Sequence, residues 1–199
     1  MVYKEPLNTI EGQKDWCRAM LKEQWTSPNA DSKWLFDFFH EKFSGGTLID
    51  LGCFRSPYIP WFAKADKVIF VDISQESLDD LKNSNKELDK TPSFEYYLTS
   101  GYELSGIPDN SVDFIFSMDA LVRILNVSDY LSYVREFRRV LKRGGQFFIH
   151  LAQQDWSEDI AKDMAQWTSE WAYNDKDWEG PGGGRVFGCR PYVIYGVKK

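Results

Sequence analysis

The chain has 199 residues, the length of one domain with one hydrophobic core. Hydrophobic residues make up 43% and charged residues 27%, and this globular composition excludes a disordered chain. The net charge of −6 disfavours nucleic acid as a partner, because tracking a phosphate backbone needs a basic surface, although a local basic patch stays compatible with it.

Membrane and metal functions are disfavoured by further absences in the sequence. No apolar run approaches the roughly 20 residues of a membrane span, and the first ten residues lack the apolar core of a signal peptide. The three cysteines form no CxxC pair, which argues against a disulfide framework and a cysteine zinc site. Only two histidines are present, so an HExxH-type site is excluded. We expect a cytoplasmic, metal-independent protein.

Two helical patterns occupy the first 45 residues. Apolar side chains recur at helical spacing from residue 10 to residue 25, and Pro28 ends this stretch. Asp31 or Ser32 can cap a second, aromatic-rich helix that ends at the glycines 45–46. We expect residues 1–45 to form a helical cover over a core at 46–199.

Short apolar runs replace the helical spacing after residue 45. They lie at 47–51, 68–71, 94–98, 112–116 and 147–151. Runs that are apolar almost throughout are typical of strands buried on both faces of a parallel sheet. Helical segments between them begin at Ser74 and at Asn126, and the second is expected to end at Lys142 and Arg143, before two glycines. This alternation predicts an α/β fold with a doubly wound, mostly parallel seven-stranded sheet.

The last third of the chain has a different pattern. Ile160, Met164, Trp167 and Trp171 have helical spacing and are expected to pack in the core. The runs 185–189 and 192–197 are almost contiguous, which predicts a C-terminal antiparallel hairpin. We expect a Trp-rich insertion at about 152–184 to help to cover the binding site.

The loop after the first strand, DLGCFRSP at 50–57, is the most informative segment. Ligands of open α/β sheets bind at the carboxyl ends of strands. Ser56 and Pro57 predict a helix start whose N-terminus favours an anionic group, with Arg55 as a further candidate to bind it. Asp72 follows Gly52 by 20 residues, where a carboxylate accepts hydrogen bonds from ribose hydroxyls. The predicted ligand therefore carries a ribose and one modest anion.

A dinucleotide fits this loop poorly. Its pyrophosphate must lie against the backbone, which requires the second and third glycines of GxGxxG. Phe54 occupies the position of the second glycine, and no third glycine follows in the loop. Nicotinamide-dependent oxidoreduction is therefore the weaker interpretation.

Four segments carry a resemblance to a known family. They are LIDLGC at 48–53, VIFVD at 68–72, IPDNSVDFIFSM at 107–118 and VLKRGGQFFIH at 140–150. With them, residues 46–151 and the final hairpin resemble the class I S-adenosylmethionine-dependent methyltransferases, of the small-molecule type. The resemblance implies a Rossmann-like fold, S-adenosylmethionine as the cofactor, and methyl transfer as the activity.

The resemblance also implies a cofactor site. Asp50 and Gly52 would line the methionine end and Asp72 would bind the ribose. The loop after the third strand would flank the adenine, and 117–119 would lie by the sulfonium and the acceptor. The expected cofactor-binding residues are Asp50, Gly52, Cys53, Phe54, Asp72, Ile73, Ser100, Gly101, Tyr102, Ser117 and Met118. The sequence departs from the family in keeping one loop glycine and in lacking an acidic residue after the third strand.

Two residues are candidates for the catalytic chemistry. His150, at the carboxyl end of the fifth strand, can serve as a base that removes a proton from the acceptor. A histidine that only hydrogen-bonds to backbone at a strand end has the same pattern. Asp119, just after the fourth strand, is a candidate base or acceptor-orienting carboxylate, and a helix cap would look the same. Both alternatives stay open for both residues.

The acceptor is expected to be a small molecule with a hydroxyl or an amine, such as a sugar or another metabolite. Arg123 and Trp178 are the candidate substrate-binding residues. The residues after the fourth strand lack the Asp/Asn-Pro-Pro-aromatic motif of DNA and protein amide methylation. The alternative function is a catalytically inactive methyltransferase-like protein that binds or regulates a partner.

Overall fold

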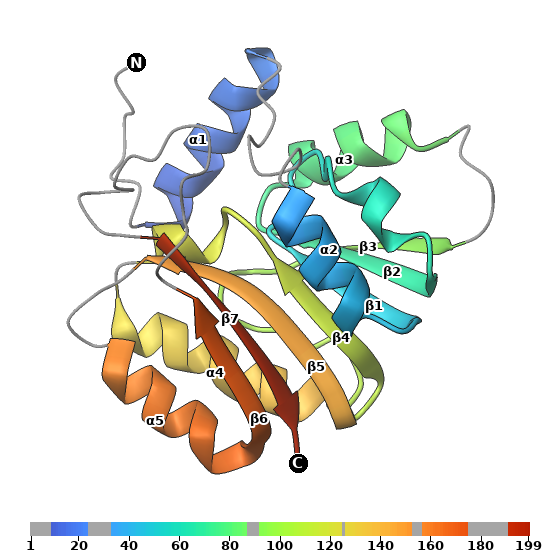
Figure 1. Ribbon diagram of the computed structural model, residues 1–199. Helices are drawn as coiled ribbons and strands as arrows, with labels where there is room; N and C mark the ends of the chain where they lie inside the picture. Colours follow the sequence, from blue (N-terminus) through green and yellow to red (C-terminus); the bar gives the residue numbers. More distant parts are fainter. Residues whose placement is uncertain (1–8, 24–32, 87–91, 125, 153–156, 175–190) are drawn as a thin grey trace.

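A seven-stranded sheet with helices on both faces forms the centre of the molecule in a computed structural model (Figure 1). The structure describes residues 9–23, 33–86, 92–124, 126–152, 157–174 and 191–199. The strand order is β3-β2-β1-β4-β5-β7-β6. Strands β1 to β5 pair in parallel, whereas β7 pairs antiparallel with β5 and β6. The predicted fold class is confirmed.

Every strand expected before residue 152 is present, and most begin earlier than the apolar run alone indicates. The strands are β1 (Gly46–Leu51), β2 (Ala65–Asp72), β3 (Ser93–Leu98), β4 (Val112–Ser117), β5 (Leu141–Ala152), β6 (Thr168–Asn174) and β7 (Pro191–Lys198). The helices are α1 (Ile10–Lys22), α2 (Lys33–Lys42), α3 (Gln75–Ser84), α4 (Val127–Val140) and α5 (Ser157–Trp167), with short 3₁₀ helices η2 (Ile59–Phe62) and η3 (Leu121–Arg123). No helix within these described residues is long and apolar enough to cross a membrane.

The two faces of the sheet are buried by different helices. Helices α4 and α5 pack on the face that carries Ile49, Ile115 and Ile149. Helices α2 and α3 pack on the opposite face, which carries Phe114 and Phe116. Burial on both faces explains why the strands read as nearly continuous apolar runs.

Helix α2 covers part of the sheet that the chain between β1 and β2 leaves open. That connection contains only the four-residue η2, whose Trp61 and Phe62 ring centroids lie 6.1 and 5.4 Å from that of Phe116 in β4. The ring of Phe39 in α2 is fully buried, with centroids 5.3 and 5.4 Å from those of Phe114 and Phe116. A segment from before the sheet thus supplies part of one layer.

The predicted helix start at Ser56 and Pro57 is wrong. Ser56 has φ of +37°, which is outside the helical region, and its hydroxyl donates a hydrogen bond to Asp50. The residue before η2 is Tyr58, which makes no side-chain cap. No long helix therefore presents its N-terminus to a ligand here, and Arg55 instead pairs with Asp80 of α3 at 3.0 Å.

The end of α4 also differs from the prediction. The helix ends at Val140, and the next residue, Leu141, is buried and pairs with Val112 of β4. Lys142 and Arg143 therefore lie in β5 rather than in the last helical turn. Lys142 binds the carboxylate of Asp113 at 2.8 Å instead of complementing a helix dipole.

The C-terminal antiparallel pair is present with a different first strand. Residue 171 lies in β6, not in a helix, because the chain leaves α5 at Trp167 and enters the sheet beside β7. Apolar spacing alone does not separate these two outcomes. The run 185–189, expected as the partner of the last strand, lies outside the described residues.

Candidate active site

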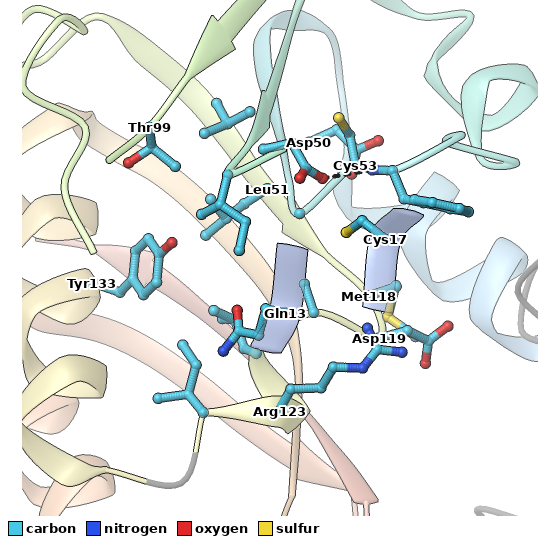
Figure 2. A pocket seen from close by; sticks show the side chains of 18 of the residues that line it. Gln13, Cys17, Asp50, Leu51, Cys53, Thr99, Met118, Asp119, Arg123 and Tyr133 are labelled. Atoms are coloured by element: carbon cyan, nitrogen blue, oxygen red, sulfur yellow. Dashed lines mark hydrogen bonds between the residues drawn. The ribbon is translucent and has the colours of Figure 1, made fainter. Parts of the chain in front are cut away.

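A cavity lies at the carboxyl ends of β1, β2, β3 and β4 (Figure 2). Residues of α1, which lies beyond this edge of the sheet (Figure 1), line it from the other side. Most of the predicted site residues line it. They are Asp50, Gly52, Cys53, Phe54, Asp72, Ile73, Tyr102, Met118, Asp119 and Arg123. Ser100, Gly101, Ser117 and His150 do not line this cavity, and Trp178 lies outside the described residues.

Gly52 brings the loop after β1 into contact with the loop after β4. Its φ is +70°, and a Cβ atom at this position would lie 2.1 Å from the Cβ of Ala120. Its amide donates to the carbonyl of Val71 at 2.7 Å, which holds the turn on β2. Only glycine fits both the backbone conformation and the contact.

Two buried carboxyl groups lie beside this turn. The Asp72 carboxylate accepts hydrogen bonds from the amides of Phe54 and Ser74, each at 2.9 Å. Burial raises the pKa of Asp72, and these amides oppose that rise. Burial raises the pKa of Asp50 to about 7, and the hydrogen bond from Ser56 opposes it. A ligand that offers a positive charge or hydroxyl donors would stabilise both ionised groups.

Phe54 accommodates the loss of the second loop glycine. It adopts φ of +46°, a conformation that is uncommon for residues other than glycine. Its ring packs against Trp16 of α1, with the centroids 5.6 Å apart, in a small cluster that also contains Cys17 and Met20. The phenyl ring thus serves as a contact for the covering helix.

Thr99 and Tyr133 lie at one end of the cavity (Figure 2). Tyr102 also lines the cavity, and its ring centroid lies 5.6 Å from that of Tyr133. The Thr99 hydroxyl donates to the carbonyl of Glu103 at 2.6 Å, and the Tyr133 hydroxyl donates to the carbonyl of Gly101 at 2.7 Å. These bonds fix the loop after β3. Ser100 and Gly101, which were expected to flank the adenine, line a neighbouring open cleft instead.

Sequence reasoning missed Thr99 and Tyr133. The position of Thr99 directly after the third strand was an available signal. Tyr133 belongs to the apolar stripe of α4, and nothing in the sequence distinguishes it from the other core residues of that stripe.

Met118 and Asp119 lie at the other end of the cavity (Figure 2). The Asp119 carboxylate lies 3.0 Å from Nδ1 of His150 and accepts a hydrogen bond from the Tyr58 hydroxyl at 3.3 Å. His150 is only 2% exposed and does not line the cavity, contrary to its expected role as a base that contacts the acceptor. The Ser117 hydroxyl donates to the Leu51 carbonyl at 2.9 Å, a bond that joins β4 to β1.

Helix α1 supplies lining residues that the sequence did not identify. They are Ile10, Gln13, Trp16 and Cys17. The guanidinium of Arg123 lies 3.7 Å from the centre of the Trp16 ring, a cation–π contact between the loop after β4 and the helix. Arg123 therefore contributes to holding α1 over the cavity, a contact that leaves its predicted role in substrate binding untested.

Comparison with known proteins identifies the family. Residues 49–149 match the family described as Methyltransferase domain. A methyltransferase from Aquifex aeolicus, described as S-adenosylmethionine-dependent, has the same fold, with a TM-score of 0.62, 18% identity, and coverage of 92% of this chain and 98% of that chain. No curated protein matches the chain.

Two further solved structures share the fold. A putative S-adenosylmethionine-dependent methyltransferase from Methanococcus maripaludis gives a TM-score of 0.63 at 17% identity, covering 100% of this chain and 97% of that chain. An rRNA methylase from Streptococcus thermophilus gives 0.58 at 12% identity, covering 83% and 94%. At these identities the structures support the fold, and the family match supports the activity.

The lining of the cavity fits the family's cofactor. S-adenosylmethionine carries ribose hydroxyls, an ammonium group and a sulfonium, and the cavity offers the buried carboxyl groups of Asp50 and Asp72 next to a turn that only glycine can form. The segment that matches the family contains both aspartates and Gly52. The chain therefore belongs to the methyltransferase domain family, and it is a class I methyltransferase with S-adenosylmethionine as its cofactor.

Proposed function

We propose that this enzyme methylates an oxygen or nitrogen atom of a small molecule. The observation that carries the proposal is the cover that α1 forms over the acceptor end of the cavity. Trp16 and Cys17 of this helix line the same cavity as Asp119, and Arg123 stacks on the Trp16 ring. A small molecule can be enclosed beneath this helix, whereas a nucleic acid strand needs an open basic groove.

Different lining residues would contact different parts of S-adenosylmethionine along the cavity. Asp72 would accept hydrogen bonds from the ribose, and Tyr102 with Thr99 would border the adenine. Asp50 and Gly52 would border the methionine end. When bound, S-adenosylmethionine supplies an electrophilic methyl group on a positively charged sulfur. The protein aligns the acceptor with that group and excludes water, which is where α1 contributes.

Calorimetric titration with S-adenosylmethionine and S-adenosylhomocysteine tests the cofactor site. We expect micromolar binding that weakens sharply in Asp72→Ala, because the ribose loses its acceptor. Asp66→Ala, which replaces an exposed aspartate of β2, is the matched control and should bind as the wild type does. Absence of binding at millimolar ligand would contradict the proposal.

The acceptor is tested by incubating the enzyme with ¹³C-methyl-labelled S-adenosylmethionine and three substrates in parallel: a cellular metabolite extract, total RNA, and total protein. Label in the metabolite fraction is the expected result. Label found only in RNA would contradict a small-molecule acceptor. It would indicate an RNA acceptor, as for the neighbour described as an rRNA methylase, despite the net charge of −6.

Metal independence and a cytoplasmic location remain predictions of the sequence. Among the described residues, no group of three or more His, Cys, Asp or Glu side chains is arranged to hold a metal ion. Treatment with EDTA should therefore leave the transfer rate unchanged, and a loss restored by added magnesium would contradict metal independence.

A further inference from the structure

Asp119 has an unusual position in the cavity. Its φ is +61°, in the left-handed region, which aspartate enters more readily than most residues other than glycine. Two side chains hold its carboxylate in place. Oδ1 lies 3.0 Å from Nδ1 of His150, and Oδ2 accepts from the Tyr58 hydroxyl at 3.3 Å.

The three side chains differ in their access to a ligand. The Asp119 side chain is 18% exposed and lines the cavity. Tyr58 lines the cavity as well, although only 4% of it is exposed. His150 is 2% exposed and does not line the cavity. An acceptor can therefore reach Asp119 directly, and it can reach His150 only through Asp119.

The contacts of His150 indicate where its proton lies. Nδ1 is 3.3 Å from the amide nitrogen of Asp119 and 3.0 Å from the carboxylate oxygen Oδ1. One nitrogen cannot accept from the amide and donate to the carboxylate at the same time. The shorter contact is also the charge-assisted one, which favours the tautomer with the proton on Nδ1.

We propose that Asp119 is the proton acceptor of the reaction, that Tyr58 is a further active-site residue, and that His150 is a positioning residue. As the acceptor molecule forms a bond to the methyl carbon, its O–H or N–H proton passes to the Asp119 carboxylate, and the carbon–sulfur bond electrons remain on sulfur. Tyr58 and His150 hold the carboxylate in place through their contacts with its two oxygens. This inference rests on the proposed function and specifies its acceptor as one that loses a proton.

The first test needs neither cofactor nor acceptor. The chain has only two histidines, so ¹⁵N-histidine spectra of the wild type and of His40→Gln assign His150. We expect the Nδ1–H tautomer in the wild type and in Tyr58→Phe, and a shift toward Nε2–H in Asp119→Ala. An Nε2–H tautomer in the wild type, or one that Asp119→Ala leaves unchanged, would overturn the assignment of His150.

The second test follows the transferred methyl group in the metabolite extract. Asp119→Asn should lower the rate at least about 100-fold, as expected for loss of a general base, and should flatten the pH–rate profile. Tyr58→Phe and His150→Asn should lower kcat while calorimetric affinity for S-adenosylhomocysteine stays near that of the wild type. His40→Gln is the control with the wild-type rate.

The chemical shift of the ¹³C-methyl group identifies the atom that receives it. A methyl on an ether oxygen or a nitrogen supports the proposal. A carboxylate ester would overturn it, because an ionised carboxylate has no proton to lose, and a thioether would overturn the assignment of an O–H or N–H acceptor. A wild-type pH–rate profile in Asp119→Asn would overturn it too. Failure to bind S-adenosylmethionine refutes the proposed function instead, and the tautomer measurement still decides the assignment of the three residues.

Discussion

Asp50 is a carboxyl group enclosed at the end of β1, and its pKa of about 7 makes the stability of the protein depend on pH. The folded chain keeps a proton on Asp50 between pH 3.8, its ordinary pKa, and about pH 7, whereas the unfolded chain loses it. Stability should therefore fall as the pH rises through this window, by at most about 1.4 kcal/mol per unit from this group. Urea unfolding of Asp50→Asn at several pH values should show a smaller slope.

The control for this measurement is Asp66→Asn, in which an exposed aspartate of β2 changes in the same way. We expect this variant to keep the slope of the wild type. A slope that Asp50→Asn leaves intact would assign the pH dependence to another group, of which the buried Asp72 is the first candidate because burial also raises its pKa.

Gly52 and Gly144 provide a matched pair at the same scale. Both have φ near +70°, but a Cβ at Gly52 would overlap Ala120, whereas one at Gly144 meets nothing within 4 Å. Each Gly→Ala change costs roughly 1–2 kcal/mol from backbone strain, and Gly52→Ala should cost about 1–3 kcal/mol more from the overlap. Urea unfolding measures both, and adding Ala120→Gly to Gly52→Ala should recover the overlap cost. Equal losses in the two single variants would refute the close approach.

At the scale of the element, α1 packs outside the two main hydrophobic clusters, and its Arg18 pairs with Glu76 of α3 at 3.7 Å. Its buried side chains join Phe54 in a small cluster outside the two clusters that cover the sheet. With α1 in place the cavity has a volume of about 80 Å³, below the roughly 300–1,000 Å³ of typical ligand pockets. We therefore expect α1 to shift when cofactor and acceptor bind.

Trp16→Ala tests this attachment, because it removes the contacts with Phe54 and Arg123. Amides of α1 should exchange with solvent at least about tenfold faster, equivalent to about 1.4 kcal/mol, while those of the sheet keep their rates. Trp34→Ala, the same change at a 36%-exposed position of α2, is the control and should leave α1 protected. Equal acceleration across the sheet would show that α1 does not open separately.

At the scale of the whole molecule, Phe39 connects a helix from before the sheet to the strands at its centre. Its ring lies within 6 Å of Phe43, Phe62, Phe114 and Phe116. Phe39→Ala should lower the free energy of unfolding by about 3–5 kcal/mol in one cooperative transition. Phe36→Ala, at a 37%-exposed position of the same helix, should cost much less. A transition that splits into two steps for Phe39→Ala would contradict a single cooperative unit.

The sequence predicts the central strands well because burial on both faces leaves a local signal in β1, β2, β4 and β5. It also predicts the carboxylates of Asp50 and Asp72, since residues at strand ends have a fixed place in this architecture. It fails at Ser56, where a side-chain bond to Asp50 replaces a helix cap, and at β6, whose pairing depends on the distant β7. The sequence did not identify the residues of α1 that line the cavity, because the apolar spacing of this helix is the same as that of any helix packed on a core.

The arrangement of α2 has a consequence for how the protein is synthesised. The segment that identifies the family, 49–149, excludes α2, whose aromatic side chains cover Phe114 and Phe116. On the ribosome, α2 emerges before every strand of this sheet, and its partner β4 follows some 70 residues later. The nascent chain thus carries an uncovered aromatic helix for several seconds at ordinary elongation rates, roughly 5–20 residues per second. A chaperone that binds aromatic segments would find its site there until β4 is made.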